Sequence, residues 1–388
     1  MCLLAEPKID EKMKNYTLEI VGLLILTTII SCEHIDDFIG HGDMQDQSIT
    51  SLQYIDEYVL PDGSMYAGTE VGGLSGIDYA DGKWYMISDD AKAPIRFYTA
   101  DIQFNENGFE NVTINGVTEL LNGSNLPFAD GEVDPEAIRI TTGGSVLWSS
   151  EGNINGGVDP VIRIANMKGT YKSNISLSEK FKVSKEENRG PRHNGVIEGL
   201  SVSFDKAGYW ASMELPLFED GSEPLVEDTD SPVRMAFINT SGAFGKEFAY
   251  ELDPIARKFD ETAFTVNGVV EILEYDTDKF LVLERSFSTG YADGGNDVKI
   301  YNVDASDATD LSGMDSLKGA DYKKATKELL FDFESVRGQL TDGVVDNIEG
   351  ITFGPVLKNG NRSLVLVADN NFSAFGPQLN QFILLEVK

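Results

Sequence analysis

The sequence contains very little cysteine and histidine. Its 388 residues include 2 cysteines, Cys2 and Cys32, and 3 histidines, His34, His41 and His193. Zinc sites usually take several Cys or His ligands, so a zinc centre of that kind is excluded. A Ser-His-Asp triad would have to recruit His193, because the other two histidines lie in the N-terminal region. Neither a Gly-x-Ser-x-Gly elbow nor a Gly-x-x-x-x-Gly-Lys-Ser/Thr loop is present, and no nucleotide or haem cofactor is expected. Carboxylate chemistry, with or without a metal ion, is what remains.

Basic residues are also scarce. There are 31 Lys and Arg against 64 Asp and Glu, which gives a formal net charge of −33. Nucleic acids are bound through dense Lys and Arg that displace counterions. The charge therefore excludes a nucleic-acid partner.

The one long apolar run is too short to span a bilayer. Residues 20–30 are apolar apart from a Gly and two Thr, whereas a transmembrane helix needs about 20 such residues. This length suits a signal peptide that starts at Met13, and Ile29-Ile30-Ser31-Cys32 resembles a bacterial lipobox. We therefore expect residues 1–31 to be a lipoprotein signal peptide, Cys32 to carry the lipid, and residues 32–49 to form an acidic tether. The protein would then be exported and anchored in the cell envelope, at the outer membrane; the alternative is a cleaved signal with an incidental Cys.

A repeat of short strands fills the rest of the chain. Five strands open with an acid or Ser beside Gly or an aliphatic residue, and 13 to 20 residues later a second strand ends in an acid. The opening positions are Ser75, Glu136, Glu198, Glu271 and Glu349. The closing positions are Asp89, Glu151, Glu214, Glu284 and Asp369. Self-similarity of this kind indicates stacked copies of one supersecondary unit.

The repeat predicts an all-β protein over residues 50–388, a β-propeller of five four-stranded blades, with six as the alternative. The last repeat contains only three strands before the chain ends at Lys388. Residues 50–60 form an alternating run that can supply its fourth strand and leave no unpaired edge.

Two explanations of the repeated acids remain open. A base opens the third strand in four repeats: Arg96, Arg163, Arg234 and Lys299. The closing acids could form structural ion pairs with these bases across neighbouring strands. The opening glutamates have no such partner, and converging carboxylates need a cation or raised pKa values.

The ordered motifs resemble those of a known family. Gly72-Gly73-Leu74-Ser75-Gly76, Asp134-Pro135-Glu136, Ile197-Glu198-Gly199-Leu200 and Asn347-Ile348-Glu349-Gly350 with Ala368-Asp369-Asn370 are similar to the phytase-like family, described as having esterase-like activity of phytase. The resemblance implies an exported propeller that hydrolyses esters or phosphoesters. It departs at Ala137, where Gly is commoner, and at Ser75, where the later repeats have Glu.

We therefore expect a divalent-cation-dependent hydrolase of phosphate or carboxylate esters, with Ca²⁺ as the cation and a small-molecule substrate. The alternative is a non-catalytic propeller that binds a glycan or a protein. The expected catalytic residues are Glu136, Glu198, Glu271 and Glu349. The expected metal ligands are Asp134, Glu198, Asn347, Glu349 and Asp369. The expected substrate-binding residues are Arg189, Arg192, His193 and Arg285.

Overall fold

The computed structural model describes residues 48–374 and 376–388. Ser48–Lys388 form one compact unit. The predicted signal peptide, Cys32 and most of the predicted tether lie outside the described residues. No helix in the described part of the chain is long and apolar enough to cross a membrane.

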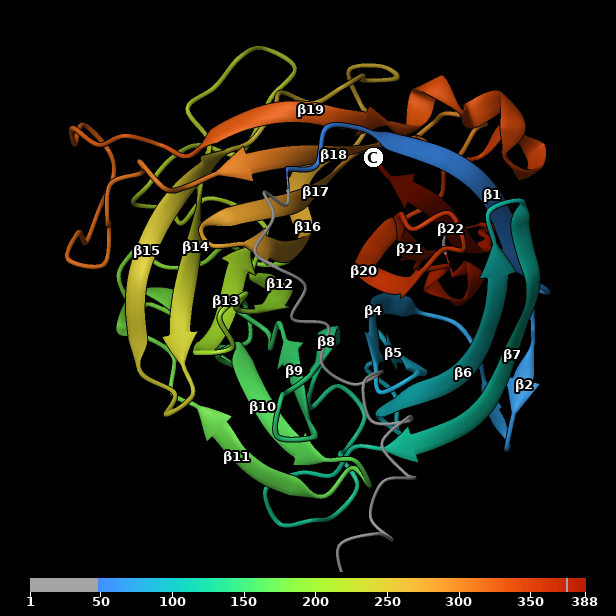
Figure 1. Ribbon diagram of the computed structural model, residues 1–388. Coiled ribbons are helices and arrows are strands. Elements are labelled where there is room, and N and C mark those ends of the chain that lie inside the picture. Colours follow the sequence, from blue (N-terminus) through green and yellow to red (C-terminus); the bar gives the residue numbers. More distant parts are fainter. Residues whose placement is uncertain (1–47, 375) are drawn as a thin grey trace, which may run out of the picture. The chain divides into compact units, whose positions relative to one another are not determined.

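The compact unit is a β-propeller of five four-stranded antiparallel blades (Figure 1). Blade 1 comprises β4 (Leu74–Ala80), β5 (Lys83–Ser88), β6 (Arg96–Asn105) and β7 (Gly108–Glu119). Blade 2 comprises β8 (Pro135–Ile140), β9 (Ser145–Ser150), β10 (Val161–Asn166) and β11 (Tyr171–Ile175). Blade 3 comprises β12 (Ile197–Val202), β13 (Gly208–Met213), β14 (Pro232–Asn239) and β15 (Phe244–Glu251). Blade 4 comprises β16 (Thr265–Asp276), β17 (Lys279–Ser288), β18 (Asn296–Asp304) and β19 (Thr326–Asp332). Blade 5 comprises β20 (Ile348–Val356), β21 (Arg362–Ala368), β22 (Asn380–Val387) and β1 (Leu52–Leu60).

The ring is closed by the N-terminal strand, as predicted. β1 pairs antiparallel with β22, from Leu52 opposite Val387 to Leu60 opposite Asn380. The fourth strand of blade 5 therefore comes from the opposite end of the chain, and both ends of the compact unit are held in one sheet (Figure 1). Beside the blades are a small hairpin and short 3₁₀ turns: β2 (Met65–Tyr66), β3 (Thr69–Glu70), η2 (Glu179–Phe181), η3 (Phe333–Ser335), η4 (Arg337–Gln339), η5 (Thr341–Gly343) and η6 (Asn371–Ser373).

The first strand of each blade lies at the axis and contacts the first strand of the next blade. These strands approach each other so closely that there is no room for a side chain at the repeated glycine. A Cβ on Gly199 would lie 3.0 Å from the backbone nitrogen of Ile272, and a Cβ on Gly350 would lie 3.0 Å from that of Ile77. Large apolar side chains fill the wedges between the blades farther out, for example the mutually packed Trp210, Phe248 and Phe280.

A single buried arginine joins all five axial strands. The Arg139 side chain is 1% exposed. Its guanidinium donates to one backbone carbonyl of each blade: Ile77 at 2.6 Å, Ile138 at 3.1 Å, Leu200 at 2.7 Å, Ile272 at 3.2 Å and Ile351 at 3.2 Å. Its charge is balanced by Glu271, with 2.7 Å between Nη2 and Oε2. Arg139 therefore fills the centre of the propeller axis, three residues after the repeated acid Glu136 on the same strand.

Candidate functional site

A ring of carboxylates is built by two repeated positions in each blade. The first position is in a β-bulge of the axial strand, at its start in four blades and in the middle of β16 in blade 4. Bulges lie between Leu74 and Gly76, Pro135 and Ile138, Ile197 and Gly199, Val269 and Glu271, and Ile348 and Gly350. The second position follows the residue of the second strand that pairs with the residue before the bulge, and in four blades that residue is the last of its strand. A bulge turns its extra side chain out of the normal alternation, so both positions face the same end of the axis.

Four blades place acids at these positions. The ring consists of Asp89 in blade 1, Glu136 and Glu151 in blade 2, Glu198 and Glu214 in blade 3, and Glu349 and Asp369 in blade 5. We call these seven residues the carboxylate ring. In blade 1 the bulge position is Ser75, whose hydroxyl donates to the carbonyl oxygen of Glu136 at 2.6 Å.

Blade 4 is shifted by one residue relative to the prediction. Glu271 takes the place that glycine has in other blades, because the missing Cβ of Gly199 faces the Cα of Glu271 at 3.2 Å. Val270 therefore occupies the bulge position. In the second strand, Glu284 pairs with Val269, so the position after it, where other blades have an acid, is Arg285. A one-residue shift moves a side chain to the other face of a strand.

The shift removes two expected acids from the ring. Glu271 binds Arg139 at the axis and accepts from the Leu200 backbone N–H at 2.8 Å. Glu284 faces the interior between blades 3 and 4, where Asn267 donates to it at 2.9 Å and Lys327 at 2.7 Å. The structure thus does not bring Glu271 to the other predicted catalytic residues.

The shift also places one arginine, Arg285, next to the carboxylate ring. Arg285 lies 3.2 Å from Glu349 and 3.6 Å from Glu214. Its side chain is 14% exposed, and its Nε is buried without a hydrogen-bond partner among the described residues. Nearby carboxylates raise its pKa even though burial acts in the opposite direction. Arg285 was predicted as a substrate-binding residue, and it is the one predicted base that the structure places inside the ring.

Burial raises the pKa of every carboxyl group in the ring. Asp89, Glu136, Glu198 and Asp369 have a pKa well above the ordinary value, first because of burial and second because of repulsion from neighbouring carboxylates. The pKa of Glu214 is raised to about 8 by burial, and Arg285 limits that rise. Burial likewise raises the pKa of Glu151 and Glu349. One arginine does not offset seven acids, of which five are buried and two, Asp89 and Glu198, are half-buried, so the ring without a further cation is held partly protonated.

Two groups of carboxylates have the spacing of a metal site. Oxygens of Asp89, Asp134 and Glu136 all lie within 4.8 Å of one another, and so do oxygens of Glu136, Glu151 and Glu198. Glu136 is common to both groups. Hard divalent cations such as Ca²⁺ prefer carboxylate oxygens, so the donor set fits such an ion. Of the predicted ligands, Asp134 and Glu198 belong to these groups.

The other predicted ligands lie on the blade 5 side of the ring. Asn347 donates from Nδ2 to Glu349 at 3.0 Å, so this amide orients a ring carboxylate. Asp369 accepts from the backbone N–H of Asn371 at 2.6 Å.

The predicted basic cluster before blade 3 is mostly engaged elsewhere. Arg192 donates to the carbonyl oxygens of Pro216 and Gly221 and stacks on Phe218, with 4.2 Å to the ring centroid. Arg189 is 3.9 Å from the carboxylates of Glu186 and Glu219. His193 is exposed and lies in the segment before β12.

The bases on the third strands do not neutralise the ring. Arg96 binds Asp90 at 2.9 Å, Arg234 binds Asp220 at 2.6 Å, and Lys299 binds Asp253 at 3.4 Å. Asp89, Glu151 and Glu214, which could have been structural partners of these bases, are instead members of the ring. The signal that could have identified them was already in the repeat, since they share one register position.

Solved structures with a similar course of chain are distant in sequence. An endo-arabinase from Bacteroides thetaiotaomicron is 11% identical, with a TM-score of 0.44 over 85% of this chain and 97% of that chain. The catalytic domain of a GH62 α-L-arabinofuranosidase from Coprinopsis cinerea is 12% identical, with a TM-score of 0.40 over 88% of this chain and 98% of that chain. No curated protein matches the sequence.

The sequence profile of one family covers most of the compact unit. Residues 69–372 match the phytase-like family, described as esterase-like activity of phytase. The match begins at β3 and ends in η6, so it includes every residue of the carboxylate ring. The chain therefore belongs to the phytase-like family.

Proposed function

We propose that the protein is a divalent-cation-dependent hydrolase of phosphate or carboxylate esters, acting at the carboxylate ring. The observation that supports this most directly is the surplus of buried acids. Seven carboxyl groups share one arginine, and each has a raised pKa. Holding so many carboxyl groups close together with one arginine among them costs stability, and such costs are typical of sites that bind a cation or move protons.

Asp89, Asp134, Glu136, Glu151 and Glu198 would hold the cation, and Ca²⁺ fits their oxygens. A bound divalent cation supplies charge stabilisation and activates water. This assignment keeps Glu136 and Glu198 from the predicted catalytic set, and it leaves out Glu271, which is committed to Arg139.

The other half of the ring can handle protons and anions. Glu214 has a pKa of about 8, so its carboxyl group can hold a proton at neutral pH and release it to a leaving group. Arg285 lies beside it and carries the positive charge that an ester phosphate or carboxylate would approach. Asn347 keeps Glu349 in place on the far side of Arg285.

The cellular setting belongs to the same proposal. Lipid at Cys32 would anchor the protein in the cell envelope, at the outer membrane, and the substrate would be a small molecule that reaches the open end of the ring. The support is the lipobox-like Ile29-Ile30-Ser31-Cys32 after an apolar run.

The test is a hydrolysis screen of aryl phosphates, aryl esters and lactones, in the presence of Ca²⁺ or a chelator. We expect turnover that requires Ca²⁺ and falls at least about 100-fold in Glu198→Gln, which keeps the size of the side chain but removes its charge. Glu227→Gln, on an exposed loop, is the matched control. Absence of turnover together with absence of Ca²⁺ binding by calorimetry would refute the proposal. Ca²⁺ binding without turnover would favour a propeller that binds a glycan or a protein.

A further inference from the structure

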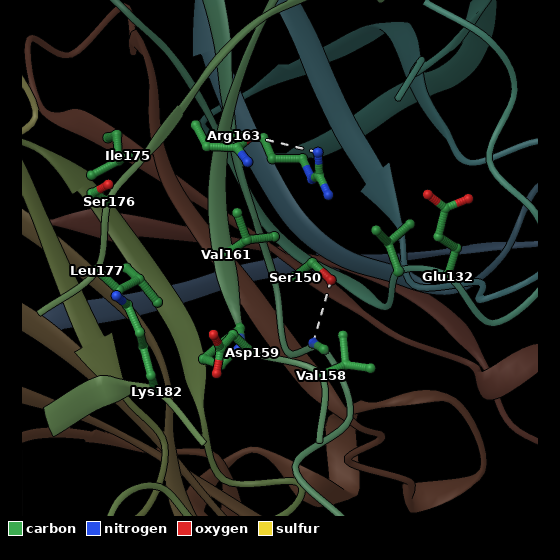
Figure 2. Close-up of a pocket in the computed structure, with 14 residues that line it drawn as sticks. Glu132, Ser150, Val158, Asp159, Val161, Arg163, Ile175, Ser176, Leu177 and Lys182 are labelled. Atoms are coloured by element: carbon green, nitrogen blue, oxygen red, sulfur yellow. Dashed lines mark hydrogen bonds between the residues drawn. The ribbon is translucent and has the colours of Figure 1, made fainter. Parts of the chain in front are cut away.

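A cavity on blade 2 lies beside the carboxylate ring, since it is lined by Ser150 and Gly152, which flank Glu151, and by Val133, which precedes Asp134. Its volume is about 300 Å³, near the lower end of the usual range for small-molecule sites. It is lined by β10, by the end of β11, by Glu132 before β8, and by the segment that leads to Lys182 (Figure 2). None of its lining residues belongs to the carboxylate ring.

The chemistry of this cavity is set by Arg163. The guanidinium lies against two aromatic rings, with 5.2 Å to the centroid of Phe128 and 5.7 Å to that of Trp148. Its one hydrogen bond within the described residues is a long one, 3.4 Å from Nη1 to Oδ1 of Asn174. The Nε is buried and has no partner there. Arg163 is half-buried, and burial lowers its pKa.

Arg163 shares the lack of an ion pair with one other arginine of the described residues, Arg362, whereas the remaining arginines pair with carboxylates. Arg96, Arg234, Arg257 and Arg337 each bind one or more carboxylates at 2.9 Å or less. Arg163 forms no ion pair with a carboxylate of the described residues, although the net charge of the chain is −33. A poorly solvated cation costs stability unless an anion compensates for it.

The acids that line the cavity have other partners. Asp159 accepts from the backbone N–H of Val183 at 2.8 Å, and Glu132 accepts from that of Ala129 at 2.9 Å. Glu132 acts on Arg163 through its charge but forms no ion pair with it. Lys182 also lines the cavity and binds Glu179, whose side chain is 89% exposed. Surface ion pairs of this kind are weak, so Lys182 can exchange Glu179 for an anion in the cavity. Figure 2 shows Glu132 and Lys182 on opposite sides of Val161, with Arg163 farther along β10.

We infer that this cavity is a binding site for a small anionic molecule whose carboxylate or phosphate group is held by Arg163. The planar guanidinium, fixed by Phe128 and Trp148, matches the two oxygens of either group. The volume admits one ring of the size of a monosaccharide. Ser176, which also lines the cavity and is exposed, offers a hydroxyl to the rest of such a ligand. The inference does not depend on hydrolysis at the carboxylate ring.

The test is a titration followed by tryptophan fluorescence and calorimetry, because Trp148 contacts the proposed anion-binding group. The probes are inorganic phosphate, galacturonate and the neutral sugar galactose. We expect saturable binding of at least one anion and none of galactose. The preferred anion distinguishes a phosphate ligand from a carboxylate ligand.

Variants separate this site from general charge effects. Arg163→Met should weaken binding of the anion roughly 10- to 100-fold, the usual value of a charge-assisted hydrogen bond. Arg163→Lys keeps the charge and should recover only part of that loss. Arg362→Met is the control, because Arg362 also lies over an aromatic ring, Phe353, at 4.4 Å. Unchanged affinity in a folded Arg163→Met, or no saturable binding of either anion to the wild type, would overturn the inference.

Discussion

Replacing Glu214 by Gln should stabilise the metal-free protein, and the gain should increase with pH. The folded protein raises the pKa of Glu214 from 4.5 to about 8, with burial as the largest cause. The unfolded chain therefore releases this proton near pH 4.5, whereas the folded protein keeps it until about pH 8. The stabilisation of the folded protein by the protonated carboxyl group is complete below pH 4.5 and is lost as the pH rises from 4.5 to about 8. Gln imitates the protonated form and does not titrate.

The size of the effect follows from the difference between the folded and unfolded pKa of Glu214. Each pKa difference of one corresponds to about 1.4 kcal/mol, so the variant should gain about 3 kcal/mol over the wild type between pH 5 and pH 8. A compact unit of about 340 residues unfolds with an entropy of about 0.7 kcal/mol per kelvin, so the Tm difference should grow by about 4 °C. Arg285 keeps Glu349 at 3.2 Å, so it is not left without a partner in the variant.

The assay is thermal unfolding by circular dichroism at pH 5, 6, 7 and 8 in the presence of a chelator. The exposed Glu227→Gln is the control and should follow the wild type throughout. If the Tm difference between Glu214→Gln and the wild type is the same at every pH, the carboxyl group does not titrate as argued. If the variant is less stable than the wild type at pH 8, the loss of its contact with Arg285 outweighs the relief of burial, and the reasoning fails.

Three further predictions concern the cation, the axis and the N-terminus. Ca²⁺ at about 100 times its Kd should stabilise the folded protein by about 2.7 kcal/mol, and the gain should be larger at pH 8 than at pH 5, since the ion displaces protons; a gain that is equal at both pH values would contradict this. Arg139→Met should lower the free energy of unfolding by about 3–5 kcal/mol by leaving Glu271 buried without its partner, as measured by urea unfolding against Arg362→Met. Deletion of residues 50–60 should lower the Tm because it exposes the edge of β22, and an unchanged Tm would refute the closure of the ring by this segment. Cys32→Ala should abolish labelling by a fatty-acid probe without changing the Tm, and equal labelling of the variant and the wild type would refute lipidation at Cys32.

The fold could be predicted because its signal is repeated. Five copies of a strand pair, each closed by an acid and all but the first opened by a Glu, fix the number of blades even where single motifs are weak. Ring closure by residues 50–60 followed from counting three strands in the last repeat, and β1 confirms it. The physical reason is that an unpaired edge on blade 5 would be costly, so a missing strand must come from elsewhere in the chain.

The register of blade 4 could not be predicted from the pattern. Val269 and Val270 are both strand formers, and alternation alone does not say which residue of the run from Val269 to Glu271 occupies the bulge. The bulge is decided by packing, since the residue after it must fit against the neighbouring axial strand. In blade 4 that residue is Glu271, and it is accommodated because its carboxylate turns to Arg139. Arg139 itself resembles any arginine on a strand, and its five carbonyl partners exist only after the ring has closed.

The partners of the third-strand bases were also beyond the pattern. Asp90, Asp220 and Asp253 lie in loops of different lengths, outside the repeated strands. Loops carry no register, so a comparison of repeats cannot align them. This matters for the site, because Arg96, Arg234 and Lys299 form ion pairs with the loop acids and not with Asp89, Glu151 or Glu214 at the strand ends.

The shift in blade 4 makes the ring asymmetric, and this asymmetry is what a hydrolase needs. The two groups with metal-site spacing, which share Glu136, come from blades 1 to 3. Arg285 enters from blade 4 and contacts Glu214 and Glu349 on its two sides. A fivefold ring of acids alone would attract cations equally from every direction and would repel an anionic ester. In the proposed hydrolase, replacing one acid position by Arg285 would give the ring one side that favours a divalent cation and another that favours an anion, and a phosphate or carboxylate ester would take a defined orientation between them.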